Sequence, residues 1–166
     1  VLNTGTAVTL QASNAINVLS PIVVNNATGN GGHLTLQTTS ASSAIRIGNQ
    51  GRITTDNGEL TLISAGDFIN NASAAPFNTG TARWTVYAND PATSSLGTNL
   101  NFDFKEYGKT YGQTLDGETA LGSTTNAVVF AQQPSLSVPS GLWDNKDYDG
   151  TTSAVMTAGV LSGLVG

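Results

Sequence analysis

Three short segments of the sequence decide the fold: Val8-Thr9-Leu10-Gln11, Leu34-Thr35-Leu36-Gln37 and Leu60-Thr61-Leu62-Ile63. Each alternates apolar and polar side chains, which is the period of two typical of a strand with one buried face. Their first residues, at positions 8, 34 and 60, are evenly spaced along the chain. One coil of a parallel β-helix with three short strands needs a repeat of this length. The hairpins of an antiparallel sandwich, the alternative architecture, would not need to recur at an identical interval.

Shorter alternations lie between these segments, at Ile16-Asn17-Val18, Ile22-Val23-Val24, Ile45-Arg46-Ile47 and Ile53-Thr54. Gly and Asn clusters separate them, and these residue types form tight turns. Stacked coils would align the inward side chains in ladders. The first ladder would contain Val8, Leu34 and Leu60, and the second Leu10, Leu36 and Leu62. We therefore predict an all-β chain whose residues 1–75 form about three coils of a parallel β-helix.

The composition excludes several classes of function. The chain has 166 residues, of which 10% are charged; 6 Lys and Arg against 11 Asp and Glu give a net charge of -5. A nucleic-acid partner needs a basic surface, so we expect none. No apolar run reaches the roughly 18 residues of a membrane span, so we expect no membrane insertion. The absence of cysteine removes thiol chemistry and Cys-ligated zinc.

The period is lost after residue 75. Pro76 and the turn Asn78-Thr79-Gly80-Thr81 are expected to end the coils. Residues 76–137 then contain most of the aromatic residues, and alternation predicts strands at Arg83–Tyr87 and Leu100–Phe104. A β-helix exposes an unpaired coil at its end and needs a cap. We therefore predict an aromatic-rich β cap over residues 76–137.

Three stretches resemble one known family. Residues Val8–Val18, followed by Pro21-Ile22-Val23, resemble the repeated coils of filamentous-haemagglutinin-like adhesins that are exported by two-partner secretion. Arg83-Trp84-Thr85-Val86-Tyr87-Ala88-Asn89-Asp90-Pro91, with Asp103-Phe104-Lys105-Glu106-Tyr107 and Tyr111-Gly112 after it, resembles the segment that follows the last coils of such adhesins. Lys146-Asp147-Tyr148-Asp149-Gly150-Thr151-Thr152 resembles the opening of the YDG modules that come next.

The resemblance implies a right-handed parallel β-helix in a secreted protein of the bacterial cell surface or extracellular matrix. It implies that residues 138–166 are a linker and the start of a YDG-like β module. The expected function is a structural and adhesive segment of a surface adhesin or extracellular fibre, with roles in adhesion or biofilm. The family has no conserved catalytic residues to transfer, so we expect no enzyme activity and no cofactor.

Two other functions stay open. The chain could be the subunit of a self-polymerising filament joined through its open ends, or it could be a carbohydrate-binding module. The partners would accordingly be further copies, the rest of a larger parent chain, or a glycan or protein of the host or matrix. For self-association the candidate residues lie in the apolar, uncharged stretch 153–166: Val155, Val160, Leu161 and Leu164.

Candidate site residues are few. Trp84 and Trp143 are candidates for stacking on a glycan, with burial in the core or cap as the alternative. The stretch Asn145–Gly150 resembles the first half of a calcium loop, but position 156, the twelfth from Asn145, is Met instead of Glu. The candidate calcium ligands there are Asp144, Asp147 and Asp149. His33, the single histidine, follows two glycines at a strand start, where an exposed turn residue is expected in place of a ligand or base.

Overall fold

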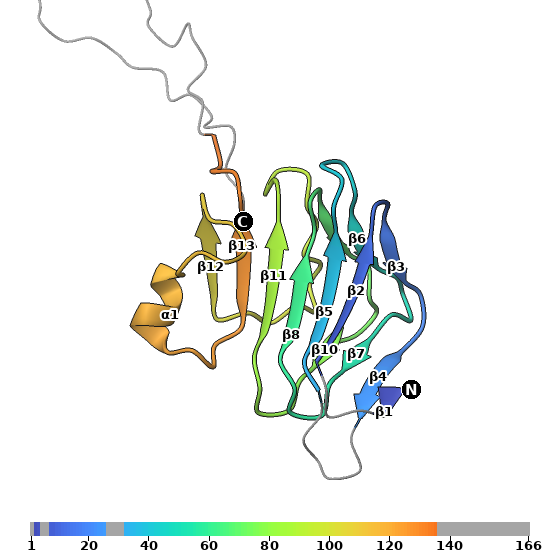
Figure 1. The fold of residues 1–166 in the computed structure, drawn as a ribbon. Coiled ribbons are helices and arrows are strands. Elements are labelled where there is room, and N and C mark those ends of the chain that lie inside the picture. The colour runs from blue at the N-terminus through green and yellow to red at the C-terminus, as the bar shows by residue number, and fades with distance from the viewer. Residues whose placement is uncertain (1, 4–6, 26–31, 136–166) are drawn as a thin grey trace, which may run out of the picture. The chain divides into compact units, whose positions relative to one another are not determined.

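The computed structural model describes residues 2–3, 7–25 and 32–135. They form a parallel β-helix of about four turns, with one short helix (Figure 1). Every strand pair among them is parallel, which confirms the predicted fold class and rules out the antiparallel sandwich. The fold contains three sheets, because each of the first three coils contributes one strand to each side; in the fourth coil, one side has only an isolated bridge, between Ile69 and Ser95.

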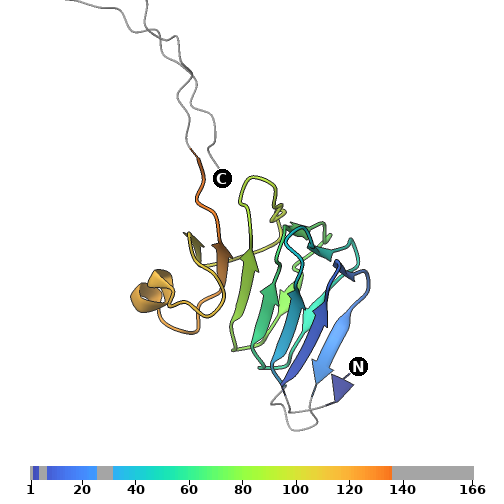
Figure 2. The ribbon, with the colours of Figure 1, turned by 45° about the horizontal axis from the view of Figure 1, so that its top comes forward.

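The largest sheet has six strands in the order β12-β13-β11-β8-β5-β2. In Figures 1 and 2 its strands lie side by side, from blue β2 to orange β13 with β12 beyond it. Their bounds are β2 Val8–Ala12, β5 Leu34–Thr38, β8 Leu60–Ile63, β11 Trp84–Ala88, β12 Phe104–Tyr107 and β13 Ala127–Phe130.

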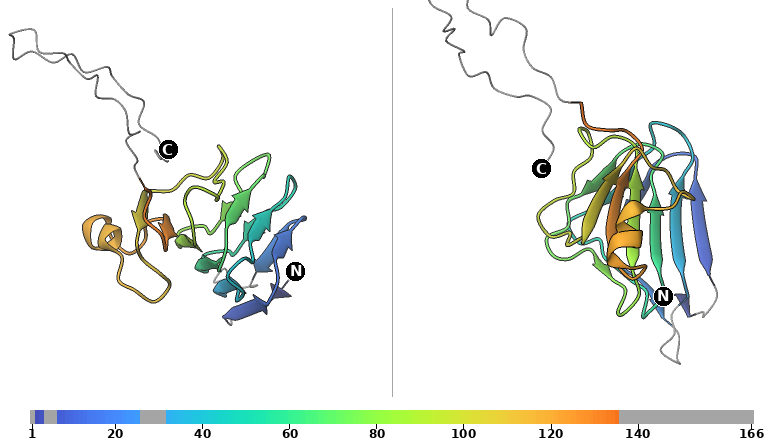
Figure 3. Two further views of the ribbon diagram at one scale, coloured as in Figure 1. Left: turned by 90° about the horizontal axis from the view of Figure 1, so that it is seen from above. Right: turned by 90° about the vertical axis from the view of Figure 1, so that its left-hand side faces the viewer.

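Two smaller sheets form the other sides of the coils, as the view from above shows (Figure 3). One has the order β3-β6-β9, with bounds Ile16–Val18, Ile45–Ile47 and Phe68–Asn70. The other has the order β1-β4-β7-β10, with bounds Leu2–Asn3, Ile22–Asn25, Ile53–Thr54 and Phe77–Asn78.

The core is a set of inward ladders in the predicted register. Leu10 pairs with Leu36, and Leu36 pairs with Leu62. The ladder then continues beyond the predicted coils through Val86 to Val128. Apart from Leu10, every member of this ladder is fully buried. The alternating burial of β5 follows from the period of two, because its Thr35 and Gln37 point out of the core.

The coils do not end at residue 75, so the prediction of about three coils was one too few. The fourth coil could not be recognised from the repeat, because the interval between Leu60 and its partner is shorter than the intervals before it. Leu60 pairs with Trp84, whereas equal spacing would have placed its partner at position 86. The turn expected to end the coils is a corner that repeats the previous one. The hydroxyl of Thr55 donates to the Gly58 carbonyl, and that of Thr79 donates to Ala82 at the same place one coil later.

The last strands follow a different order in space than in sequence. After β11 the chain passes to β12 at the edge of the sheet, forms helix α1 (Asp116–Leu121), and returns as β13 between β11 and β12. Figure 3 shows α1 against the outer face of the sheet at this end. The strand expected at Leu100–Phe104 begins only at Phe104, since Leu100 packs into the core as part of a loop.

A second, smaller core lies under α1. Leu115, Ala127 and Val129 are buried there, with Tyr87 and Phe104 packed against them. Strand β13 is therefore buried on both faces, which explains its uninterrupted apolar sequence. Gly117 permits the close approach of the helix, because a Cβ at this position would lie 2.3 Å from the Phe104 ring.

The chain divides into two units, residues 1–133 and 134–166. The predicted linker and YDG-like module at 138–166 lies outside the described residues. No helix in the described part of the chain is long and apolar enough to span a membrane.

Candidate functional site

The structure describes only two of the residues singled out from the sequence as possible sites, Trp84 and His33. The others lie outside the described residues: Trp143, Asp144, Asp147, Asp149, Val155, Val160, Leu161 and Leu164. Within residues 2–3, 7–25 and 32–135, no three His, Cys, Asp or Glu side chains gather as ligands of a metal ion would.

Trp84 is a core residue and not a platform for a glycan. Its side chain lies in the inward ladder and is 5% exposed. Its ring contacts Phe77 edge to face, with the ring centroids 5.2 Å apart. Stacking on a sugar needs an accessible ring face, so the glycan-stacking interpretation of Trp84 was wrong.

His33 is exposed at the start of β5, and it belongs to a row of polar residues that runs across the coils. Its Nδ1 accepts a hydrogen bond from the Glu59 backbone N–H at 3.2 Å. Glu59 also lies 3.6 Å from the guanidinium of Arg83, which forms an ion pair with Glu118 on α1. Partly exposed pairs of this kind stabilise a fold by roughly 0–1 kcal/mol each. The row therefore ties the starts of three strands to the helix.

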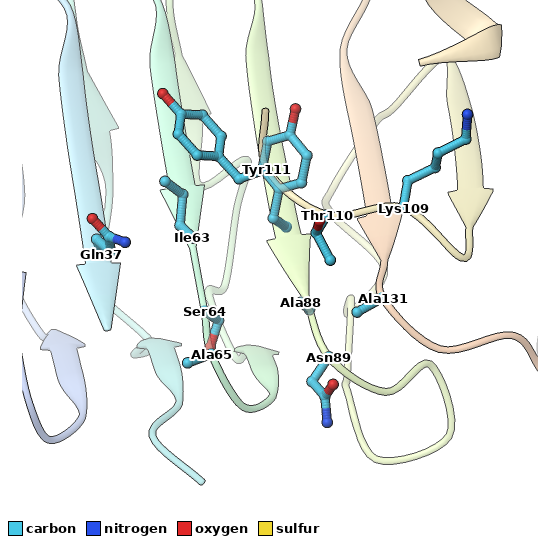
Figure 4. A pocket seen from close by; sticks show the side chains of 11 residues that line it. Gln37, Ile63, Ser64, Ala65, Ala88, Asn89, Lys109, Thr110, Tyr111 and Ala131 are labelled. Atoms are coloured by element: carbon cyan, nitrogen blue, oxygen red, sulfur yellow. The ribbon is translucent and has the colours of Figure 1, made fainter. Parts of the chain in front are cut away.

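A groove lies on the outer face of the six-stranded sheet, at the carboxyl ends of β5, β8 and β11 (Figure 4). Its cavity volume is about 400 Å³, within the range of small-molecule sites. Its floor is a column of outward side chains in register, since Gln37 pairs with Ile63 and Ile63 with Tyr87. The remaining lining residues are Ser64, Ala65, Ala88, Asn89, Lys109, Thr110, Tyr111 and Ala131.

The loop Gly108–Tyr111, directly after β12, forms one wall of the groove. Gly108 has a φ of 74°, a conformation that favours glycine, and this lets the chain turn as soon as the strand ends. The Lys109 N–H donates to the Phe130 carbonyl at 3.2 Å, and the Thr110 N–H donates to the Gln113 side chain at 2.6 Å. These bonds fix the wall against β13 and against the turn that follows.

The charge of Lys109 is balanced locally. Its Nζ lies 3.6 Å from a carboxylate oxygen of Glu106 and 3.5 Å from one of Asp116. It also donates to the Thr114 carbonyl at 3.1 Å. The groove therefore offers little unbalanced positive charge to an anion.

Two tyrosines give the groove its aromatic surface. The rings of Tyr87 and Tyr111 meet edge to face, with their centroids 5.4 Å apart. Tyr111 is 58% exposed, and Figure 4 shows it reaching from the loop across the strands toward Ile63. Burial raises the pKa of the Tyr87 phenol, and the Glu118 carboxylate raises it further, while Arg83 opposes the rise. Tyr87 therefore keeps its proton and remains a neutral donor near pH 7.

Several polar groups in the groove have no hydrogen-bond partner among the described residues. They are the hydroxyls of Tyr87 and Tyr111, the carboxamide of Asn89 and the Nε2 of Gln37, whose Oε1 accepts a bond from Gln11 at 3.1 Å. By contrast, the Ser64 hydroxyl is committed to backbone carbonyls, that of Asp67 in its own corner and that of Ser43 in the preceding coil. The groove thus combines an exposed ring with free amide and hydroxyl groups.

Sequence reasoning did not identify this groove. The floor of the groove could have been predicted from the sequence, because the register of Gln37 and Ile63 follows directly from the even spacing of the repeated segments. The wall gave no comparable signal, since its position depends on β13 lying between β11 and β12. For the chain as a whole, no family model matches, and neither does any curated protein or solved structure.

Proposed function

We propose that this chain is a structural and adhesive segment of a secreted bacterial surface adhesin or extracellular fibre. The observation that supports this function is the unbroken inward ladder from Leu10 to Val128, which joins four coils and the cap strand in one stack. Each coil contacts mainly its neighbours, so such a stack works as a stiff, extended scaffold. The resemblance of the coil sequence to filamentous-haemagglutinin-like adhesins supports the same function.

The outer surface of the stack supports an adhesive role. The outward columns of the large sheet contain threonine in the first three coils and glutamine in the first two, followed by Ile63 and Tyr87, so they present hydrogen-bonding groups at the spacing of the strands. Because the backbone ladder sets the positions of these residues, their spacing is fixed before any partner arrives. Binding to residues at a fixed spacing avoids the entropic cost of ordering a loop.

Adhesion of beads that carry the chain tests this function. Beads coated with the purified chain are expected to adhere to immobilised matrix proteins or matrix polysaccharides more strongly than uncoated beads. Beads carrying Leu62→Asp, which buries an unpaired charge in the ladder and unfolds the stack, should lose the difference. Equal adhesion of native, unfolded and uncoated beads on every surface would contradict the proposal.

A further inference from the structure

We propose that the groove at Tyr87 and Tyr111 binds a neutral saccharide chain, with the exposed ring of Tyr111 as the stacking platform. This inference rests on the proposed adhesive function and names the class of molecule that the segment would hold. It places a glycan site on the outer face of the sheet, where the aromatic ring is accessible, instead of at the buried Trp84.

The chemistry of the groove matches that of a sugar. A pyranose ring has an apolar face of C–H groups and an equator of hydroxyls, so it needs a flat apolar surface with hydrogen-bonding groups beside it. Tyr111 provides the flat surface, and its edge contact with Tyr87 holds it in place. The free groups of Asn89, Gln37 and the two phenols can each donate or accept a hydrogen bond beside that ring. Lined in this way, the groove suits a ligand that is apolar on one face and polar at its edge.

The electrostatics favour a neutral ligand over an acidic one. The single cation in the described lining, Lys109, is already flanked by the carboxylates of Glu106 and Asp116. The chain has a net charge of -5, which repels anions at longer range. The groups free for bonding are amides and neutral hydroxyls.

The floor of the groove indicates the direction of the bound chain. Gln37, Ile63 and Tyr87 are adjacent rungs, so the first and third lie on the order of 10 Å apart. Gln11 extends the amide row by another rung through its bond to Gln37. A saccharide chain would therefore cross the strands, along the axis of the coils.

Titration by nuclear magnetic resonance tests the site with three neutral probes: cellohexaose, maltohexaose and chitohexaose. At least one probe at millimolar concentration should shift the backbone resonances of Asn89 and Tyr111. Tyr111→Ala should weaken its binding by roughly tenfold through loss of the ring, whereas Tyr111→Phe should retain most of it. Leu121→Ala removes a side chain of similar exposure, 57%, on α1 outside the groove, so it should bind as the native chain does.

Other outcomes overturn the proposal. It is wrong if none of the three probes shifts these resonances, or if binding survives Tyr111→Ala unchanged. It is also wrong if hexagalacturonic acid, the acidic comparator, binds more tightly than every neutral probe. Self-association that Tyr111→Ala abolishes would show that a second copy occupies the groove instead.

The bead assay separates this inference from the proposed function. If native beads adhere to matrix surfaces and neither the saccharides nor Tyr111→Ala reduce adhesion, the saccharide site is wrong and the adhesive function stands. If native beads adhere to no surface, while the soluble chain still binds a probe through Tyr111, the adhesive function is wrong and the site stands.

Discussion

Leu62 and Leu10 belong to the same inward ladder but differ in burial. Leu62 is fully buried between coils, whereas Leu10 is 46% exposed in the first described coil. We expect Leu62→Ala to lower the free energy of unfolding by about 2–5 kcal/mol, because it removes buried methyl groups and leaves a cavity. Leu10→Ala should lower it by roughly 1 kcal/mol, since about half of its side chain is already in water. Urea denaturation of both variants measures the difference, and equal losses would contradict the register.

The raised pKa of Tyr87 predicts how the free energy of unfolding changes at high pH. Below about pH 10 both the folded and the unfolded chain hold the phenol proton, so Tyr87 contributes no pH dependence there. Above this value the unfolded chain, with the ordinary pKa of 10.0, loses the proton first. The free energy of unfolding should therefore fall as the pH rises from 10 toward the higher pKa of the folded state.

Tyr87→Phe isolates this contribution. The variant should lose less stability than the native chain when urea denaturation is compared at about pH 8 and about pH 11. The ultraviolet absorbance of the folded native chain should also show one tyrosine that ionises later than in the unfolded chain. If the variant and the native chain lose the same amount of stability between these two pH values, folding does not raise the pKa of Tyr87.

At the scale of elements, the residue that leads into helix α1 covers the outer face of β13. Leu115, 1% exposed, precedes the helix and packs with Ala127 and Val129 of that strand. Leu115→Ala should destabilise the chain by about 2–5 kcal/mol and speed amide hydrogen exchange in β13 more than in β5. Leu121→Ala, on the exposed side of the helix, should change neither. Equal acceleration in β13 and β5 would show that the cap and the coils unfold as one unit.

The coil elements could be predicted from the sequence because each is defined by a local alternation and a repeat. Leu34, Leu60 and their neighbours have the expected register for this reason. The fourth coil was missed because it is shorter than the others and Pro76 suggested a break, although Pro76 only precedes the short strand β10. Helix α1 was missed because so short a helix shows no periodicity. The groove was missed because Tyr111 reaches the floor through a strand order that is not sequential.

At the scale of the whole molecule, the predicted self-association is still to be tested. Its candidate residues, Val155, Val160, Leu161 and Leu164, lie outside the described part of the chain. If they join copies, the full chain should sediment as oligomers, and a chain ending at residue 150 should sediment as a monomer with an unchanged β-sheet circular dichroism spectrum. Identical sedimentation of the two chains would exclude these residues as the connector.

The described coils also differ from one end of the stack to the other, and this bears on filament formation. Head-to-tail stacking requires two complementary coil faces. In the first described coil, Leu10 and Leu19 are exposed and apolar. At the opposite end, the edge strand β12 places Lys105 in register with the inward Val128, and its Nζ lies 5.2 Å from the centre of the Phe102 ring. An inward-pointing charge on an edge strand opposes pairing with another strand.

Lys105→Leu tests whether this residue keeps the edge of β12 from pairing. A strand added to β12 would bury the ammonium group of Lys105 in the continuation of the apolar ladder, at a high cost in free energy. The leucine variant removes that cost and extends the ladder, so its sedimentation coefficient should rise with concentration more steeply than that of the native chain. Lys109→Leu removes the same charge from the groove wall, outside the ladder, and should not have this effect. If both variants associate equally, net charge and not the position of Lys105 limits association; if neither does, something other than Lys105 protects this edge.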